Sequence, residues 1–572
     1  TLDDGAAAYC QVRMVTWLES LHSKVRSRWI KSVLLELLAY IRQEGMKVTP
    51  KSELARAKQE LARFVELGVL VSEESLIRYG GDRERDRGIS TVAIVTKNRP
   101  QYVRRCLESL CANLNMVAGP VVVCVYDDSE DEQTERVVNE IRSGLMGDNL
   151  ILRHVGQKAK RELAKRLAAA GEIQTDLVEF GIFRPYPYGP GYGANLNSVL
   201  LSTAGQLVIC MDDDVVLPLR AWSEPDGALR LASTTDPTDV ATYLRRADAI
   251  ASVIESEDNI IECHLRLLGR TLSGCLAESH CAADLSGMAP TFVSSLLGGD
   301  SRVAVTMTGI VGDAGTSITE WLVRGDGSWR RLTTSELDYQ SLVNSREVVR
   351  GVRSCIITDG RFFMNACAGF DNRELLPPFL PVMRNMDGVF AALLRFACPE
   401  LHIGYLPRLV VHDPPERPAV QAILKGPRLS EYLIAAIQEA SSMVVEGSDA
   451  SSRMRLIGRY LTEVGSLSRV AFEGWLRRQA HAFIMGRIKF YDNALRNATD
   501  APYYWIDRVS ERLVAFRKLL TSGDLSLAAD DLIAGRKSQE ACAITQDLVR
   551  DYGRLVESWP VFMAAARDIT VL

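Results

Sequence analysis

The sequence alternates between short apolar runs and segments whose apolar residues recur at helical spacing. Residues 90–96 form an apolar run typical of a buried strand, and a polar segment containing a proline follows at 97–100. Residues 103–114 then carry apolar side chains three and four positions apart, which predicts a helix, and residues 121–125 predict a second strand. A strand–helix–strand unit is typical of a right-handed crossover in a parallel sheet, so the pattern predicts an α/β fold.

Acidic residues close two of the predicted strands. Asp127 and Asp128 follow the second strand, and three aspartates, Asp212 to Asp214, follow a further apolar run at 207–211. The carboxyl ends of parallel strands are where α/β folds collect ligands, and residues two positions apart point to the same side. Such carboxylates suit a hard divalent cation that carries a diphosphate. The alternatives are a solvated acidic loop for the triplet and an Asx-turn for the pair.

Helical spacing dominates both flanks of this region. Residues 12–41 and 49–68 predict helices, residues 69–71 a short strand, and the charged, glycine-flanked residues 80–88 a linker. Beyond Pro418 further helices are predicted at 429–437, 454–464, 470–488 and 509–520. The chain therefore divides into an N-terminal, mainly helical domain (1–82), an α/β domain (83–420) and a C-terminal helical domain (421–572) that is long enough to fold separately.

The distance between the acidic triplet and the end of the α/β domain predicts an insertion at about residues 219–349. Within it, residues 303–315 have the pattern of a strand that enters a glycine-rich turn. We expect either an ordinary turn or a loop that offers Asp313 to a sugar or an acceptor.

Composition fits an ordinary globular enzyme of two to four domains, with 572 residues, 47% hydrophobic and 24% charged. No run approaches 18 uninterrupted apolar residues, and the first residues lack a cationic signal region. The 12 cysteines include no CxxC pair, which argues against structural zinc and favours the reducing cytoplasm. A net charge of −5 gives no field that would attract nucleic acid.

Five segments together resemble the family 2 glycosyltransferases of the GT-A fold: AIVTKNRP, VVVCVYDDSEDEQT, GYGANLN followed by AGQLVICMDDDV, LPPFLPVMRNMDGVF and LPRLVVHDPP. The resemblance extends over residues 90–418. It implies a Rossmann-like, mixed and mainly parallel sheet, a DxD motif that binds Mn²⁺ or Mg²⁺, and an inverting transfer from a nucleotide sugar. More weakly, residues 10–78 resemble a winged-helix module; the alternative is a helical subdomain that packs on the catalytic domain.

The family resemblance implies a role for each of the following residues. It assigns the metal to Asp212, Asp214 and His412, and the general base to Asp387. It places the donor nucleotide against Thr96, Asn98, Arg99, Asp127, Asp128, Asn197, Asp212 and Asp213. From the residues alone, His412 also fits a structural or surface histidine, and Asp387 also fits a helix N-cap.

Two positions depart from the family pattern. Family members commonly have a glutamate before the base, where this chain has Met386, and an arginine where it has Leu196. The first change removes a like charge that would raise the pKa of the base, and the second removes a planar donor. No basic phosphate clamp is evident near the aspartates. Both departures bear on donor preference and catalytic rate more than on the fold.

The sequence therefore predicts a cytoplasmic, metal-dependent, inverting hexosyltransferase that uses a UDP-sugar. The acceptor stays open among a glycan, a small metabolite and a peptide or protein, with the flanking domains favouring a macromolecule and leaving room for self-association. No nucleic-acid partner is expected. The alternatives are a nucleotidyltransferase on a related fold and a binding or scaffold protein with a degenerate transferase core.

Overall fold

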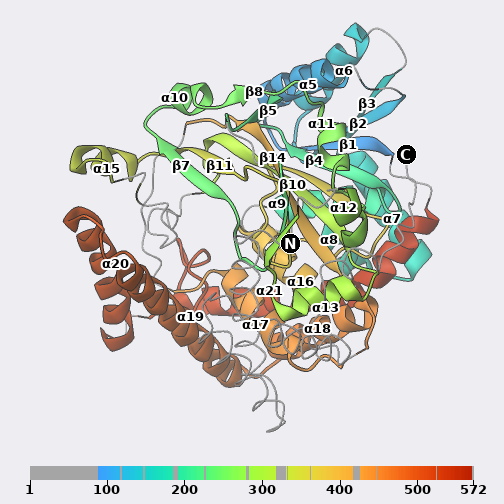
Figure 1. Cartoon of the computed structure of the whole chain (residues 1–572). Coiled ribbons are helices and arrows are strands. Elements are labelled where there is room, and N and C mark those ends of the chain that lie inside the picture. The colour runs from blue at the N-terminus through green and yellow to red at the C-terminus, as the bar shows by residue number, and fades with distance from the viewer. Residues whose placement is uncertain are drawn as a thin grey trace, which may run out of the picture.

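The computed structural model describes residues 88–569 except 116, 118, 146–148, 184–190, 224–226, 279–282, 317–329, 331–332, 361, 417–425, 446 and 523–524 (Figure 1). The predicted N-terminal domain (1–82), with its winged-helix resemblance, lies outside the described residues, as does nearly all of the linker. In the described part of the chain, no helix is long and apolar enough to cross a membrane.

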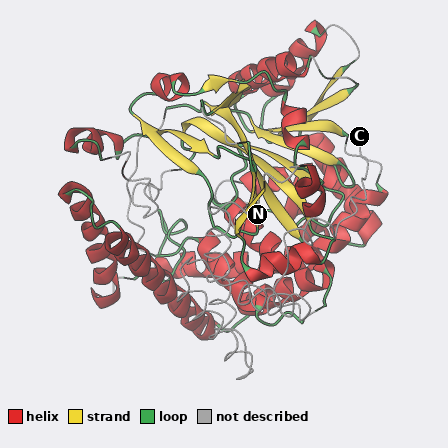
Figure 2. Cartoon of the chain, in the orientation of Figure 1, coloured by secondary structure: helices red, strands yellow, loops and turns green. Residues whose placement is uncertain are grey.

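The described strands form one 14-stranded mixed sheet, yellow in Figure 2. Its main path runs β3 (Leu150–Val155), β2 (Val121–Asp127), β1 (Ile89–Thr96), β4 (Leu207–Asp212), β13 (Cys367–Asp371), β10 (Arg302–Asp313), β14 (Leu401–His412), β12 (Ile356–Thr358), β6 (Leu229–Ala232) and β9 (Ala283–Gly287). Beside this path lie β5 (Val215–Ala221), β7 (Asp239–Tyr243), β8 (Ile254–Glu255) and β11 (Glu347–Gly351).

Strands β3, β2, β1 and β4 pair in parallel, and β13 pairs antiparallel with β4. The first crossover is α5 (Pro100–Leu114), as predicted from residues 103–114. The mixed α/β fold expected from the sequence is thus confirmed. Antiparallel pairs accumulate beyond β4, and most of the strands from β5 to β11 come from the residues predicted to be an insertion (219–349), which stays a prediction.

Side chains of the central strands alternate between two apolar layers. Ala93 and Cys124 face one layer, whereas Val92, Ile94 and Val123 face the other, which is the two-residue period of a strand buried on both sides. The first layer is covered by α7 (Gln157–Gly171), α8 (Thr175–Ile182), α9 (Tyr192–Ser202), α16 (Met386–Ala397), α17 (Leu429–Ser441), α18 (Ala450–Gly465) and α21 (Ser538–Asp568). The second is covered by α5, α6 (Gln133–Gly144), α11 (Ile260–Leu265), α12 (Leu272–Glu278) and α13 (Pro290–Leu297).

Each of the four predicted C-terminal helices is present, in α17, α18, α19 (Arg469–Asn497) and α20 (Tyr503–Ser522). The sequence analysis did not predict α21, which packs against α18, α7 and α8 (Figure 1). Buried residues of α17, α18 and α21 belong to the same apolar cluster as those of the sheet. The division of the chain at residue 420 stays a prediction, and the helices beyond it share a continuous core with the α/β region.

Helix α21 also fixes a segment that leads to the catalytic candidates. The Tyr552 hydroxyl donates to the Pro378 carbonyl (2.9 Å), and the Trp559 indole N–H donates to the Leu376 carbonyl (2.8 Å). All of these groups are buried away from water, where an unmade hydrogen bond is costly. Two side chains of α21, 174 and 183 positions later in the chain than their partners, therefore hold the segment before Asp387 in place.

The first turn of α9 packs closely on this segment, and Gly193 makes the approach feasible. A Cβ atom at Gly193 would lie 1.9 Å from the Leu380 carbonyl oxygen. We predict that Gly193→Ala lowers the free energy of unfolding by about 1–3 kcal/mol or more, because backbone must move. In the matched control Gly474→Ala, within α19, a Cβ meets nothing within 4 Å, and a gain of about 0.5–1 kcal/mol is expected. Equal melting temperatures by scanning calorimetry would contradict the close approach.

Candidate functional site

A cavity of about 1090 Å³ opens at the carboxyl ends of β1 and β4. These strands lie side by side, with Val95 opposite Asp212, while β1 connects onward to β2 on its other side. The direction of strand addition reverses at this point, which is where open α/β sheets bind ligands. The volume is slightly above the range of roughly 300–1,000 Å³ that is typical of small-molecule pockets. Of the predicted site residues, those lining the cavity are Thr96, Asn98, Arg99, Asp128, Asp212, Asp213, Asp214, Asp387 and His412.

Asp213 is held by two groups from the end of β1. The Thr96 hydroxyl donates to Asp213 (2.6 Å), and the Arg99 guanidinium contacts both Asp213 and Asp214, each at 2.9 Å. Burial raises the pKa of Asp213 to about 6, and the positive charge of Arg99 limits the rise. In this structure Arg99 therefore forms ion pairs with Asp213 and Asp214, whereas the family resemblance implied that it contacts the donor nucleoside.

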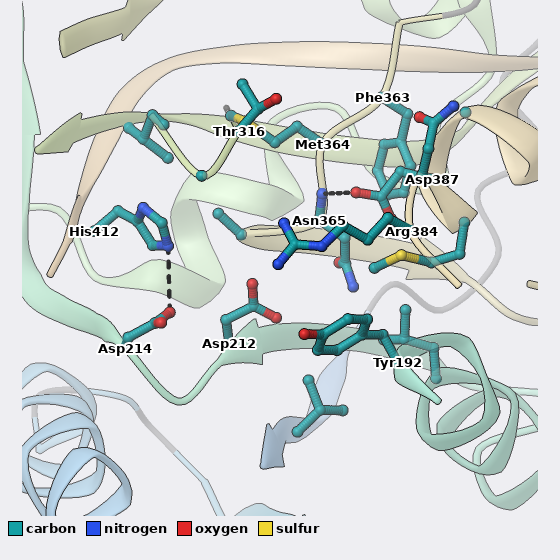
Figure 3. Close-up of a pocket in the computed structure, with 18 of the residues that line it drawn as sticks. Tyr192, Asp212, Asp214, Thr316, Phe363, Met364, Asn365, Arg384, Asp387 and His412 are labelled. Carbon is teal, nitrogen blue, oxygen red and sulfur yellow. Dashed lines mark hydrogen bonds and ion pairs between the residues drawn. The ribbon is translucent and has the colours of Figure 1, made fainter. Parts of the chain in front are cut away.

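Asp214 and His412 form the strongest candidate for a metal site. His412 Nε2 lies 3.3 Å from Asp214 Oδ1, and its Nδ1 donates to the Asp313 carbonyl (2.6 Å), so both ring nitrogens face oxygen atoms (Figure 3). Burial lowers the pKa of His412, but the hydrogen bonds and charges of Asp214 and Asp313 outweigh burial and raise it, and a metal ion would take the place of the Nε2 proton. A ligating histidine normally donates its other N–H in this way. Burial raises the pKa of Asp214, but the interactions with His412 and Arg99 outweigh burial and bring it to about 2.

The donor set of this pair fits a divalent cation. One carboxylate and one imidazole would leave most coordination positions to diphosphate oxygens and water, the arrangement that Mg²⁺ favours with phosphate substrates. Asp212 points into the same cavity. Burial and the negative charges of Asp214 and Asp213 raise the pKa of Asp212 well above the usual value. Among the described residues, no group of three or more His, Cys, Asp or Glu side chains already converges on one point.

Asp313 is not available as a base. Its carboxylate accepts two hydrogen bonds from Arg346, at 2.6 and 2.8 Å, and one from the Gly315 amide, and it does not line the cavity. Its carbonyl instead orients His412. Of the two alternatives for residues 303–315, these contacts favour the ordinary turn, because the Asp313 side chain is already paired with Arg346 in a buried ion pair.

Asp387 lies in the first turn of α16 but does not cap it. Asn385 occupies the N-cap position, and the Asp387 carboxylate accepts instead the amide N–H of Asn365 (3.1 Å). Its second oxygen, Oδ1, is buried without a hydrogen-bond partner among the described residues. Burial raises the pKa of Asp387 to about 7. A carboxylate that is unsatisfied and titrates near neutrality has the properties of a general base.

The two acids after β2 have different surroundings. Asp127 Oδ1 accepts the Ser129 amide (2.8 Å), the Asx-turn that was the alternative, and its other oxygen lies 3.0 Å from His154 Nε2. Asp127 does not line the cavity. Asp128 does, and it is paired with the ammonium group of Lys160, a fully buried residue of α7. Lys160 is a site residue that the sequence analysis missed, because its helical pattern gives no sign of the partner.

Asn197 lies outside the cavity, contrary to expectation. Its amide group donates to the carbonyls of Gly181 and Phe379 and accepts the Phe379 amide, at 2.8–3.0 Å. All its polar atoms are thus used in joining α8 and α9 to the segment around Phe379. Leu196 and Met386, the departures from the family pattern, both line the cavity.

Arg384 is the second residue that the sequence analysis missed. It lies three positions before Asp387 and lines the cavity, where Figure 3 shows its guanidinium extended above Asp212. The motif MRNMDG held the signal, but nothing in the sequence placed this arginine beside aspartates 170 positions earlier. A basic group near the aspartates is therefore present after all.

Comparisons with known proteins give distant structural similarity alone. No protein-family profile and no curated sequence matches the chain. Similar solved structures include S. aureus TarS 1–349 with UDP (12% identity, 83% of this chain, 91% of that chain, TM-score 0.28). They also include the mannosyltransferase PcManGT of Pyrobaculum calidifontis with GDP-Man and Mn²⁺ (14%, 85%, 93%, 0.28), and mouse xyloside xylosyltransferase 1 (14%, 26%, 55%, 0.15). With TM-scores of this size, any functional assignment depends on the residues of the cavity.

The raised pKa of Asp387 predicts a pH-dependent stability difference. An unfolded carboxyl has a pKa of about 3.9, so the protonated folded form is favoured, and this contribution is full below about pH 4 and lost as the pH rises to about 7. Asp387→Asn has no charge to bury. Its stability relative to the unmodified protein should therefore grow across pH 4–7, by at most about 1.4 kcal/mol per pH unit.

Calorimetric melting of both proteins from pH 4 to pH 8, without metal, measures this difference. Asp131→Asn, the same substitution at an exposed position outside the cavity, provides the comparison. A difference for Asp387→Asn that stays constant with pH would mean that the carboxyl titrates normally.

Proposed function

We propose that this protein is a metal-dependent, inverting glycosyltransferase that moves a hexose from a UDP-sugar to an acceptor hydroxyl. The observation that carries the proposal is that one cavity, at the switch point of the sheet, contains both the Asp214–His412 pair and the unsatisfied Asp387. A leaving-group site and a base are both needed for sugar transfer.

The nucleoside is proposed to bind at the end of the cavity formed by β1 and β2. Asn98 adopts the left-handed conformation (φ 55°) and its amide donates to Ser129, which sets the loop at the end of β1. Lys160 holds Asp128 in place, and the carboxylate can accept a hydrogen bond from a uracil N–H or a ribose hydroxyl. The nucleoside end is thus prepared before the ligand arrives.

The diphosphate is proposed to lie between Asp212 and the Asp214–His412 pair. A divalent cation bound there supplies Lewis-acid stabilisation of the charge on the departing diphosphate. Arg99 screens Asp213 from the phosphates, and the Asp313 carbonyl keeps His412 in the tautomer that can ligate. These residues orient the leaving group.

Asp387 is proposed to act on the acceptor. As the acceptor oxygen bonds to the anomeric carbon, the bond from that carbon to the β-phosphate oxygen breaks, and its electron pair leaves with UDP. The acceptor proton passes to Asp387 Oδ1. One displacement of this kind inverts the anomeric configuration. A base with a pKa near 7 is well matched to neutral pH.

The first test concerns the metal. Asp214→Ala should abolish the Mn²⁺-dependent part of UDP binding in calorimetry, and His412→Ala should weaken it, because each removes a ligand from the same site. Asp131→Ala, at an exposed turn outside the cavity, is the control. Unchanged metal-dependent binding in Asp214→Ala would place the metal elsewhere.

The second test concerns the base. Asp387→Asn should retain UDP binding but lower turnover on a hydroxyl acceptor by about 10²–10⁴-fold, because the proton acceptor is lost. In the unmodified protein, turnover should rise with pH through about 7 as Asp387 ionises. A thiol acceptor, which ionises more readily, should suffer less from the substitution. Full turnover of Asp387→Asn on a hydroxyl acceptor would remove Asp387 from the mechanism.

Slow release of UDP from UDP-sugars in the presence of Mn²⁺ separates the classes of protein. A transferase hydrolyses the donor slowly when no acceptor is present, whereas a binding or scaffold protein releases none. Screening nucleotide sugars by thermal shift with Mn²⁺ first identifies the donor to use.

A further inference from the structure

Arg384 is a positively charged residue of the cavity with no charged partner among the described residues. Its side chain is exposed to the cavity, and Figure 3 shows the guanidinium directed toward the space above Asp212. None of the residues that the structure describes forms a hydrogen bond or an ion pair with it. The other arginines lining the cavity each have a carboxylate partner: Arg99 with Asp213, Arg350 with Asp236 and Arg428 with Glu431.

The backbone on either side of Arg384 is strained. Met383 (φ 70°) and Asn385 (φ 65°) both adopt the left-handed conformation, which non-glycine residues seldom adopt. Such strain persists only where surrounding contacts impose it, and it clusters at ligand clamps. Here the Met383 side chain is buried in the core, and the side-chain amide of Asn385 donates to the Ser430 hydroxyl (3.1 Å). The two contacts hold the loop in the form that directs Arg384 into the cavity.

Three aspartates make the region beside Arg384 acidic, so a diphosphate bound there would need a cation. Asp212, Asp213 and Asp214 carry three negative charges when ionised, Arg99 offsets one, and a divalent cation would offset the other two. A diphosphate at that position would then meet no remaining positive charge from these groups. Lys97 also lines the cavity, but it lies near Lys160, at the proposed nucleoside end. Arg384 supplies the missing cation on the aspartate side.

We propose, on the basis of the function proposed above, that Arg384 is a further catalytic residue that binds the donor diphosphate and stabilises its departure. When the bond between the anomeric carbon and the phosphate oxygen breaks, the electron pair stays on that oxygen. The planar guanidinium donates hydrogen bonds to the phosphate oxygens as this charge grows. Because Arg384 and Asp387 belong to one loop, leaving-group stabilisation and proton removal are fixed relative to each other.

Two substitutions test the proposal. Arg384→Met keeps most of the length without charge, and Arg384→Lys keeps the charge without the planar fork. With Mn²⁺, Arg384→Met should bind UDP about 10- to 100-fold more weakly, while uridine, measured by competition, should bind unchanged. Turnover of the UDP-sugar should fall about 10²–10³-fold. Arg384→Lys should recover part of both losses, and Arg136→Met, an exposed arginine of α6, should lose neither.

The outcomes separate the alternatives. Unchanged UDP binding with a raised KM for the acceptor would overturn the proposal and give Arg384 to the acceptor. Equal loss of uridine and UDP binding would also overturn it, because the substitution would then have disturbed the whole cavity. If the unmodified protein binds no UDP with Mn²⁺, the proposed function fails before the variants are compared, so the two failures are distinguishable.

Discussion

The candidate site depends on a junction where three remote segments meet. The Asp413 amide donates to the Asp214 carbonyl (2.8 Å), His412 lies opposite Gly312 in the pairing of β14 with β10, and the Asp313 carbonyl accepts the His412 ring N–H. Gly312 has a φ of 119°, and a Cβ there would lie 2.4 Å from the His412 carbonyl oxygen. No other residue could occupy this position without moving the histidine.

A second set of contacts holds Asp413, the residue after His412, in place. Arg105 of α5 and Arg246 of α10 (Arg246–Ala251) both contact the Asp413 carboxylate, and Arg246 also pairs with Glu347 of β11. These groups come from the first crossover and from the segment between β5 and β13, so the strands of that segment do more than enlarge the sheet. They fix the position of the residue next to His412.

Environment gives chemically identical carboxylates different roles. Asp214 is held ionised by His412 and Arg99, with a pKa of about 2, whereas burial without a cation raises the pKa of Asp387 to about 7. The two are connected through one short segment, since the Ala366 carbonyl accepts the Asp212 amide and the Asn365 amide binds Asp387. Pairs of titratable groups whose surroundings separate their pKa values are typical of acid–base sites.

The sequence by itself determined the α/β pattern of β1, α5, β2 and β4 and the acids at their carboxyl ends, because period-two burial and strand-end chemistry are local properties. Only the tertiary structure decided which of these acids face the cavity. In the folded chain Asp127 and Asn197 form structural hydrogen bonds, and Asp313 forms an ion pair with Arg346. Folding also places Lys160 beside Asp128 and directs Arg384 into the cavity above Asp212. These outcomes depend on pairing and packing between segments far apart in the chain, and no local pattern of residues encodes such distances.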